Sequence, residues 1–206
     1  MIFIIYIFIA YFLGSIPTAV WLGKSKYGID VREHGSKNAG ATNTFRVLGK
    51  PAGTVVLLID VAKGALAVLL PSITGYAVWG SDILIHTQLA CGITAVLGHV
   101  FPLFANFKGG KGVATSLGVI IGIHPLAASI CLGIFLLVFI VSNYVSLGAM
   151  VAAFSFPWLV QLLFNNENLY LMIFSILLSI AVIGAHHKNI KRIANGEENK
   201  MNLFKK

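Results

Sequence analysis

Three short polar segments combine side chains that are suited to holding phosphate groups. The first, residues 35–50, reads GSKNAGATNTFRVLGK and mixes glycines with hydroxyl, carboxamide and cationic side chains. Glycines let backbone N–H groups approach an anion, and an arginine binds phosphate through two parallel hydrogen bonds. The same composition also suits a flexible connecting loop. Both interpretations stay open for this segment taken alone.

The second segment, residues 98–115, reads GHVFPLFANFKGGKGVAT. Its KGGKG run stands directly before a predicted helix, whose N-terminal N–H groups attract anions, and two lysines add positive charge. Lys111 is followed by Gly112 rather than Ser or Thr, so the run is not a nucleotide-binding Walker A loop. A glycine-rich re-entrant pore loop remains an alternative.

The third segment, residues 184–192, reads GAHHKNIKR. His186 and Asn189 are three residues apart and share a helix face that would close over a site. The alternative is an interfacial helix end whose lysines complement the helix dipole and anionic lipids. No second cluster of Cys, Asp or Glu accompanies the histidines, so no metal site is predicted. The following residues, 195–200, are expected to be solvated and frayed.

A few polar residues outside these segments are further candidates. Asp60 and Lys63 lie in an apolar stretch as i,i+3 neighbours, and intramembrane charges are costly enough to be functional candidates. A mutual structural pair is an equally good explanation. Ser146 belongs to a short polar turn that either lines the site or is only a loop. His99 precedes the second segment and is a candidate for orienting it.

The composition indicates that lipid surrounds much of the chain. Of its 206 residues, 57% are hydrophobic and 11% are charged, with a mean hydropathy of +0.87. The net charge of +8 is explained by cytoplasmic anchoring rather than by nucleic-acid binding. The N-terminus has no basic region before its apolar stretch and is predicted to be a retained span rather than a cleaved leader. Cys91 and Cys131 lie in apolar runs and are predicted to be packing residues.

The apolar stretches predict seven transmembrane helices. Most reach the roughly 17–25 residues that cross a bilayer as helix, but the fourth is too short to do so alone. The predicted spans are 2–23, 53–73, 83–104, 113–123, 125–142, 146–164 and 169–186. Basic connections (24–52, 105–112, 187–206) alternate with connections that lack Lys and Arg (74–82, 124–125, 165–168). We therefore expect an all-α integral membrane protein, a single domain over residues 1–206, with its N-terminus outside and its C-terminus in the cytoplasm.

The three segments, in this order and spacing, resemble the PlsY family of bacterial acyl-phosphate:glycerol-3-phosphate acyltransferases over essentially the whole chain. The resemblance implies a multi-pass protein of the bacterial inner membrane whose active site faces the cytoplasm. It implies transfer of an acyl group from acyl phosphate to the 1-hydroxyl of sn-glycerol 3-phosphate, giving lysophosphatidic acid and phosphate. Acyl-CoA is not the donor, no metal or cofactor is needed, and a functional link to the acyl-phosphate-producing enzyme is expected.

The resemblance also assigns residues by motif. The catalytic candidates are Ser36, Arg46, Lys111, His186 and Asn189. The candidates for binding substrate or phosphate are Asn38, Thr42, Asn43, Lys108, Gly109, Gly110, Gly112 and Ser146. Lys37 departs from the family, many members of which have glycine there, and His187-Lys188 is a second departure. A transporter or channel for a small anion is the competing class, whereas a CDP-alcohol phosphotransferase would need an aspartate cluster that is absent.

Overall fold

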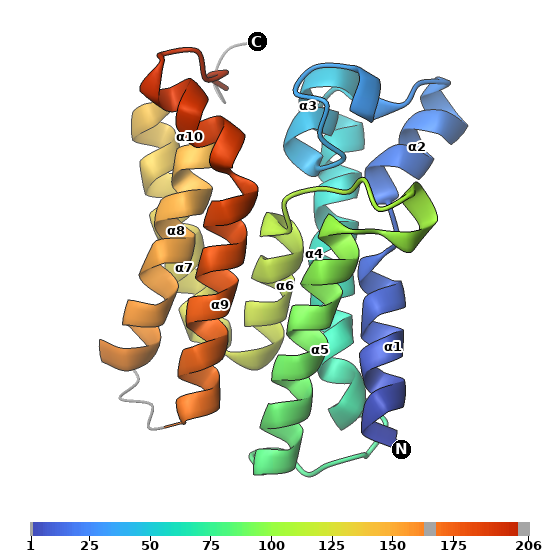
Figure 1. Ribbon diagram of the computed structural model, residues 1–206, viewed down its shortest axis with the longest axis vertical. Coiled ribbons are helices and arrows are strands. Elements are labelled where there is room, and N and C mark those ends of the chain that lie inside the picture. Colours follow the sequence, from blue (N-terminus) through green and yellow to red (C-terminus); the bar gives the residue numbers. More distant parts are fainter. Residues whose placement is uncertain (1, 163–167, 202–206) are drawn as a thin grey trace. The chain divides into compact units, whose positions relative to one another are not determined.

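The computed structural model describes residues 2–162 and 168–201, and its regular elements are all helical. Their contacts divide the chain into two compact units, Met1–Ile123 and His124–Lys206, each described by itself (Figure 1). The end of the predicted 146–164 span and residues 165–167 of the next connection lie outside the described residues. A single domain over the whole chain stays a prediction.

The first unit is a bundle of long helices with short elements at one end. Figure 1 shows α1, α4, α5 and α6 side by side, with α2, α3 and the segment after α5 at the same end. Both polar segments of this unit therefore lie at one end of it. Its elements are α1 (Ile2–Gly14), α2 (Thr18–Tyr27), η1 (Val31–Glu33), α3 (Ala41–Leu48), α4 (Lys50–Ile73), α5 (Asp82–Val100), η2 (Leu103–Ala105) and α6 (Val113–Ile123).

Glycines let the helices of this bundle pack backbone to backbone. A Cβ atom at Gly64 of α4 would overlap the carbonyl of Thr115 in α6, and one at Gly118 of α6 would overlap the carbonyl of Val61 in α4. Small residues at helix contacts are the usual means of close packing in membranes, where van der Waals contact replaces the hydrophobic effect. This reciprocal contact fixes α6, and hence the second polar segment before it, against α4.

The first predicted span is interrupted. The apolar pattern predicts one helix over 2–23, whereas α1 ends at Gly14 and α2 starts at Thr18. Pro17 has no N–H group to donate to the carbonyl of Leu13 four residues back, so the helix cannot continue through it with regular hydrogen bonding. The carbonyl of Ile16 instead accepts a hydrogen bond from Lys63 Nζ at 2.9 Å. The intramembrane lysine therefore satisfies backbone that the break exposes.

The second unit contains α7 (Pro125–Ser142), α8 (Val145–Leu162), α9 (Leu169–Ala185) and α10 (His187–Ala194). The first three helices pack in sequence order, α8 against both neighbours. The axis of α10 is bent by 57° from that of α9, and His186 stands at the bend. In Figure 1, α10 lies at one end of its unit.

The number of membrane crossings is only partly tested by these elements. Within the described residues, five helical stretches are long and apolar enough to span a membrane, or six when the bent pair α9–α10 counts as one span. The remaining apolar helix, α6, has 11 residues and is only about 16 Å long. The all-helical membrane class is confirmed, while seven crossings and the orientation of the termini stay predictions.

Candidate functional site

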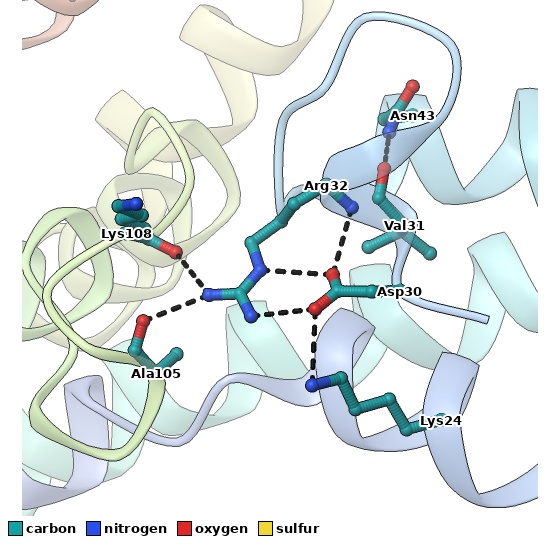
Figure 2. A network of polar contacts seen from close by, with 7 residues as sticks. All are labelled: Lys24, Asp30, Val31, Arg32, Asn43, Ala105 and Lys108. Carbon is teal, nitrogen blue, oxygen red and sulfur yellow. Dashed lines mark hydrogen bonds and ion pairs between the residues drawn. The ribbon is translucent and has the colours of Figure 1, made fainter. Parts of the chain in front are cut away.

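The first polar segment is organised around Asn43, which is 1% exposed. Its Nδ2 donates to the carbonyls of Val31 at 2.7 Å and His34 at 3.1 Å, the former drawn in Figure 2. Its Oδ1 accepts from the N–H of Ser36 at 2.8 Å and from the Ser36 hydroxyl at 3.1 Å. The carboxamide of Asn43 therefore shapes the loop and orients Ser36, a catalytic candidate. Its assignment as a substrate ligand stays a prediction.

The residues on both sides of Ser36 have positive φ angles, which glycine adopts most readily. Gly35 and Lys37 both have φ of 58°, in the left-handed region that β-carbons disfavour. This conformation gives a physical reason for a glycine preference at position 37 and shows that lysine is accommodated there. The other candidates of this segment lie close by in the chain: Asn38 before α3, Thr42 in its first turn and Arg46, which is exposed, in its last turn.

The second polar segment is pinned to the end of α5. The N–H of Gly109 donates to the carbonyl of Val100 at 3.2 Å, and that of Gly110 to the carbonyl of His99 at 3.1 Å. A Cβ atom at Gly110 would overlap the His99 ring, so only glycine fits there. These two N–H groups are committed to the protein. The groups of this segment with the chemistry to donate to an anion are the two lysine side chains and the N–H groups of the first turn of α6, which have no partner within the helix.

Gly112 completes this segment with φ of 79° and leads directly into α6. Lys108 is exposed and Lys111 is half-buried. The glycines assigned to substrate binding thus act by allowing close packing and a left-handed turn, while the lysines supply the charge. The assignment of these residues to substrate binding stays a prediction, and the structure adds the packing of the glycines.

Asp30 and Arg32 join the two segments and were missed in the sequence. Figure 2 shows the Arg32 guanidinium paired with Asp30 through Nε–Oδ1 at 3.0 Å and Nη2–Oδ2 at 2.7 Å. Its Nη1 donates to the carbonyls of Ala105 at 2.9 Å and Lys108 at 3.5 Å. The hydrogen bonds from Arg32 hold the pKa of the Asp30 carboxyl well below its usual range, although burial opposes the shift. The pair is therefore charged at neutral pH.

A buried charged cluster lies beneath the segments. Lys63 Nζ is 2.8 Å and His99 Nδ1 is 3.7 Å from Asp60 Oδ1, and the Thr18 hydroxyl donates to the same oxygen at 3.2 Å. The carboxyl and ammonium groups are 1% and 4% exposed. This cluster, the break after α1 and the glycines of the second segment line a small hollow that has no room for a water molecule. The proximity of Asp60 to His99 could not be read from the chain pattern, since the two residues are 39 positions apart on different helices.

In the second unit, two site candidates, Ser146 and Asn189, contact the C-terminal tail. Glu198 Oε1 accepts from Ser146 Oγ at 2.7 Å and from Asn189 Nδ2 at 2.6 Å, while Oε2 accepts from Arg192 Nε at 2.8 Å. The expectation of a solvated, frayed tail is wrong at Glu198, which is only 8% exposed. Burial raises the pKa of Glu198, but the three hydrogen bonds outweigh it and leave the pKa lowered. A carboxylate therefore organises Ser146 and Asn189.

His186 is also buried, at the α9–α10 bend. Its Nδ1 lies 2.7 Å from the carbonyl of Val182. Because a carbonyl only accepts, Nδ1 carries the proton in this contact, and Nε2 of the neutral ring then has the lone pair. This tautomer suits a group that takes a proton through Nε2.

We predict that Glu198→Gln disorders the tail and lowers activity at least about tenfold, because the neutral amide replaces an acceptor of three hydrogen bonds. The pKa of Glu198 is depressed in the folded protein, so its stabilising effect is present above the unfolded pKa and is lost as pH falls through the folded value. Glu197→Gln, at the exposed neighbouring carboxylate, is the matched control. Turnover in detergent measures activity, and thermal unfolding measures stability. Equal activity and stability of the two variants would contradict the role of Glu198 in organising Ser146 and Asn189.

The predicted site residues thus fall into two groups. The first unit brings together Ser36, Asn38, Thr42, Asn43 and Arg46 with the Lys108–Gly112 segment at one end, joined by Arg32. The second unit brings together Ser146 and Asn189, with His186 at the start of the same bend. Apolar helices that carry glycine-rich, cationic loops define an integral membrane protein.

Comparison with known proteins gives the family. The model of the glycerol-3-phosphate acyltransferase family matches residues 4–196, and this chain belongs to that family. The glycerol-3-phosphate acyltransferase of Fusobacterium nucleatum is 43% identical, covering 97% of this chain and 98% of its own length. That of Streptococcus pyogenes serotype M1 is 46% identical, covering 95% and 92%.

Two solved structures support the same family assignment. A crystal structure of PlsY, an integral membrane glycerol 3-phosphate acyltransferase, in its glycerol 3-phosphate form has a TM-score of 0.88 and 33% identity, covering all of both chains. A lysophosphatidic acid form of PlsY gives 0.84 and 31%, covering 98% of this chain and 96% of the other. The resemblance drawn from the three motifs is confirmed, and the chain is an acyltransferase enzyme of the membrane.

Proposed function

We propose that this protein transfers an acyl group from an acyl phosphate to the 1-hydroxyl of sn-glycerol 3-phosphate, giving lysophosphatidic acid and inorganic phosphate. The observation that carries the proposal is the contact that Arg32, three residues before the first glycine-rich, cationic segment, makes with the second such segment at one end of the first unit. The family of the chain and the glycerol 3-phosphate named for the related crystal structure support the choice of acceptor.

The chemistry requires two phosphorylated substrates to meet. Their repulsion is offset by cations, which Arg46, Lys108 and Lys111 supply. The glycerol hydroxyl oxygen attacks the acyl carbonyl carbon, and donors such as Ser36 stabilise the negative charge that develops on the carbonyl oxygen. The bond from the acyl carbon to the phosphate oxygen then breaks, and phosphate leaves without needing a strong acid. The hydroxyl proton passes either to His186 Nε2 or to a substrate phosphate.

The proposal includes a location and topology. Seven crossings with the N-terminus outside place the basic segments on the cytoplasmic side of the bacterial inner membrane, as the distribution of Lys and Arg favours. There a soluble acceptor meets a donor whose acyl chain lies in lipid, and a functional link to the enzyme that makes the acyl phosphate follows. No metal or cofactor takes part in the proposed steps, and all 206 residues act as one enzyme.

Purified protein in detergent, given palmitoyl phosphate and glycerol 3-phosphate, should release phosphate and form lysophosphatidic acid. Parallel reactions with palmitoyl-CoA test the donor, and turnover with the CoA ester alone would overturn the acyl-phosphate assignment. Reconstitution in liposomes tests the competing class: flux of a small anion without any covalent product would identify a transporter or channel instead.

A further inference from the structure

The guanidinium of Arg32 has contacts on both sides of the junction between the two cationic segments. Two of its nitrogens pair with Asp30, and the third donates to carbonyls of the second segment (Figure 2). The side chain is 20% exposed and that of Asp30 10%. A bidentate arginine–carboxylate pair fixes the orientation of the guanidinium plane. The remaining nitrogen is thereby aimed at the second segment.

The second segment needs such an external contact, because its turn is strained. Asn106 and Phe107 have φ of 54° and 57°, two consecutive non-glycine residues in the left-handed region. Such residues are strained and keep this conformation only where their surroundings hold it. The carbonyls that accept from Arg32, those of Ala105 and Lys108, flank these two residues on either side. Arg32 therefore ties the turn at both of its ends.

On the other side, Arg32 is part of the scaffold of the first segment. Asp30 Oδ1 caps η1 by accepting the N–H of Arg32 at 3.0 Å. The carbonyl of Val31, the residue before Arg32, accepts a hydrogen bond from Asn43 Nδ2. Asn43 Oδ1 in turn accepts one from the N–H of Ser36. Unbroken hydrogen bonding and backbone therefore run from the Ser36 turn to the Lys108 backbone. Lys24 makes a third contact to Asp30 at 3.2 Å, but its side chain is 58% exposed.

We propose that Arg32 is a positioning residue that fixes the spacing between the Ser36–Arg46 segment and the Lys108–Lys111 segment, so that both engage glycerol 3-phosphate and its acyl donor at once. This role rests on the proposed function. Arg32 itself touches no reacting atom in this scheme. Loss of the tie weakens ground-state and transition-state binding alike, which raises KM and changes kcat less.

Kinetics of Arg32→Ala, Arg32→Lys and the control Lys24→Met test the proposal. We expect Arg32→Ala to raise KM for glycerol 3-phosphate about tenfold or more, with a smaller change in kcat. Arg32→Lys keeps the positive charge but cannot form the two parallel hydrogen bonds of a guanidinium. Its KM for glycerol 3-phosphate should therefore rise less than that of Arg32→Ala. Lys24→Met should stay near wild type. Equal losses in kcat and kcat/KM, or an unchanged KM in Arg32→Ala, would overturn the positioning role.

Hydrogen–deuterium exchange of the substrate-free protein tests the same tie without turnover. The N–H groups of residues 107–110 are all hydrogen-bonded to carbonyls of residues 99–105. Arg32→Ala should speed exchange in this stretch and leave α7 and α8 unchanged, which also shows that the variant is folded. Unchanged exchange at 107–110 would refute the tie even if the enzyme is active. A wild-type protein that fails to turn over, with exchange changed as expected, would reject the proposed function and keep the tie.

Discussion

Replacing Lys111 by methionine is expected to lower kcat/KM by about 10²–10³-fold while the protein stays folded, because a fixed cation at the reacting phosphates is lost. The backbone on each side of Lys111 is held in place. The N–H of Gly110 donates to the carbonyl of His99, and the carbonyl of Gly112 accepts from the N–H of Ser116 at 2.7 Å. The ammonium group is therefore carried on a rigid support, and methionine keeps its length without its charge.

The control for this substitution is Lys26→Met at the exposed end of α2, which removes the same net charge elsewhere. Phosphate release with palmitoyl phosphate and glycerol 3-phosphate measures activity, and thermal unfolding in detergent measures integrity. Full activity in the Lys111 variant would remove this lysine from the site. An equal loss in the Lys26 variant would show that net charge, and not position, is responsible.

The sequence was informative where local chemistry determines structure. Apolar stretches of membrane length predicted most of the helices, because burial in lipid depends mainly on composition and length. The three polar segments were recognised by their order and spacing, since each one taken alone also suited a simpler structural explanation. The break after α1 was not predicted, although Pro17 stands in the pattern, since the apolar run continues through it.

Contacts between distant residues were beyond local reasoning. Glu198 stands in a charged, polar tail that looks solvated, yet its carboxylate lies 52 positions along the chain from the hydroxyl of Ser146, to which it is hydrogen-bonded. Asp30 and Arg32 look like ordinary loop charges until the η2 turn is placed beside them. Both contacts are visible only in the fold, because no periodic pattern in the sequence indicates which distant residue Glu198 or Arg32 will meet.

The second large effect is expected at Asp60 and Lys63, whose pairing the sequence left undecided between a structural and a substrate role. Removing one partner of a buried ion pair leaves an uncompensated charge and typically costs about 3–5 kcal/mol. Lys63→Met also withdraws one of the two donors to the Ile16 carbonyl at the α1–α2 break, and leaves only the N–H of Thr18. We therefore expect Lys63→Met to lower thermal stability in detergent strongly, whereas Asp82→Asn, at an exposed helix start, should change it by about 1 kcal/mol at most.

The double variant Asp60→Asn/Lys63→Met separates the two roles of the pair. If the pair is structural, deleting both charges should restore much of the stability lost in Lys63→Met, because a neutral amide costs less to bury than an unpaired carboxylate. Activity should then recover together with stability, since Lys63 Nζ is occupied by Asp60 and by the Ile16 carbonyl. A double variant that is stable but inactive would instead assign Lys63 to substrate. The contacts favour the structural outcome: Lys63 holds the backbone of the break, and Thr18, the first residue of α2, donates to the same carboxylate.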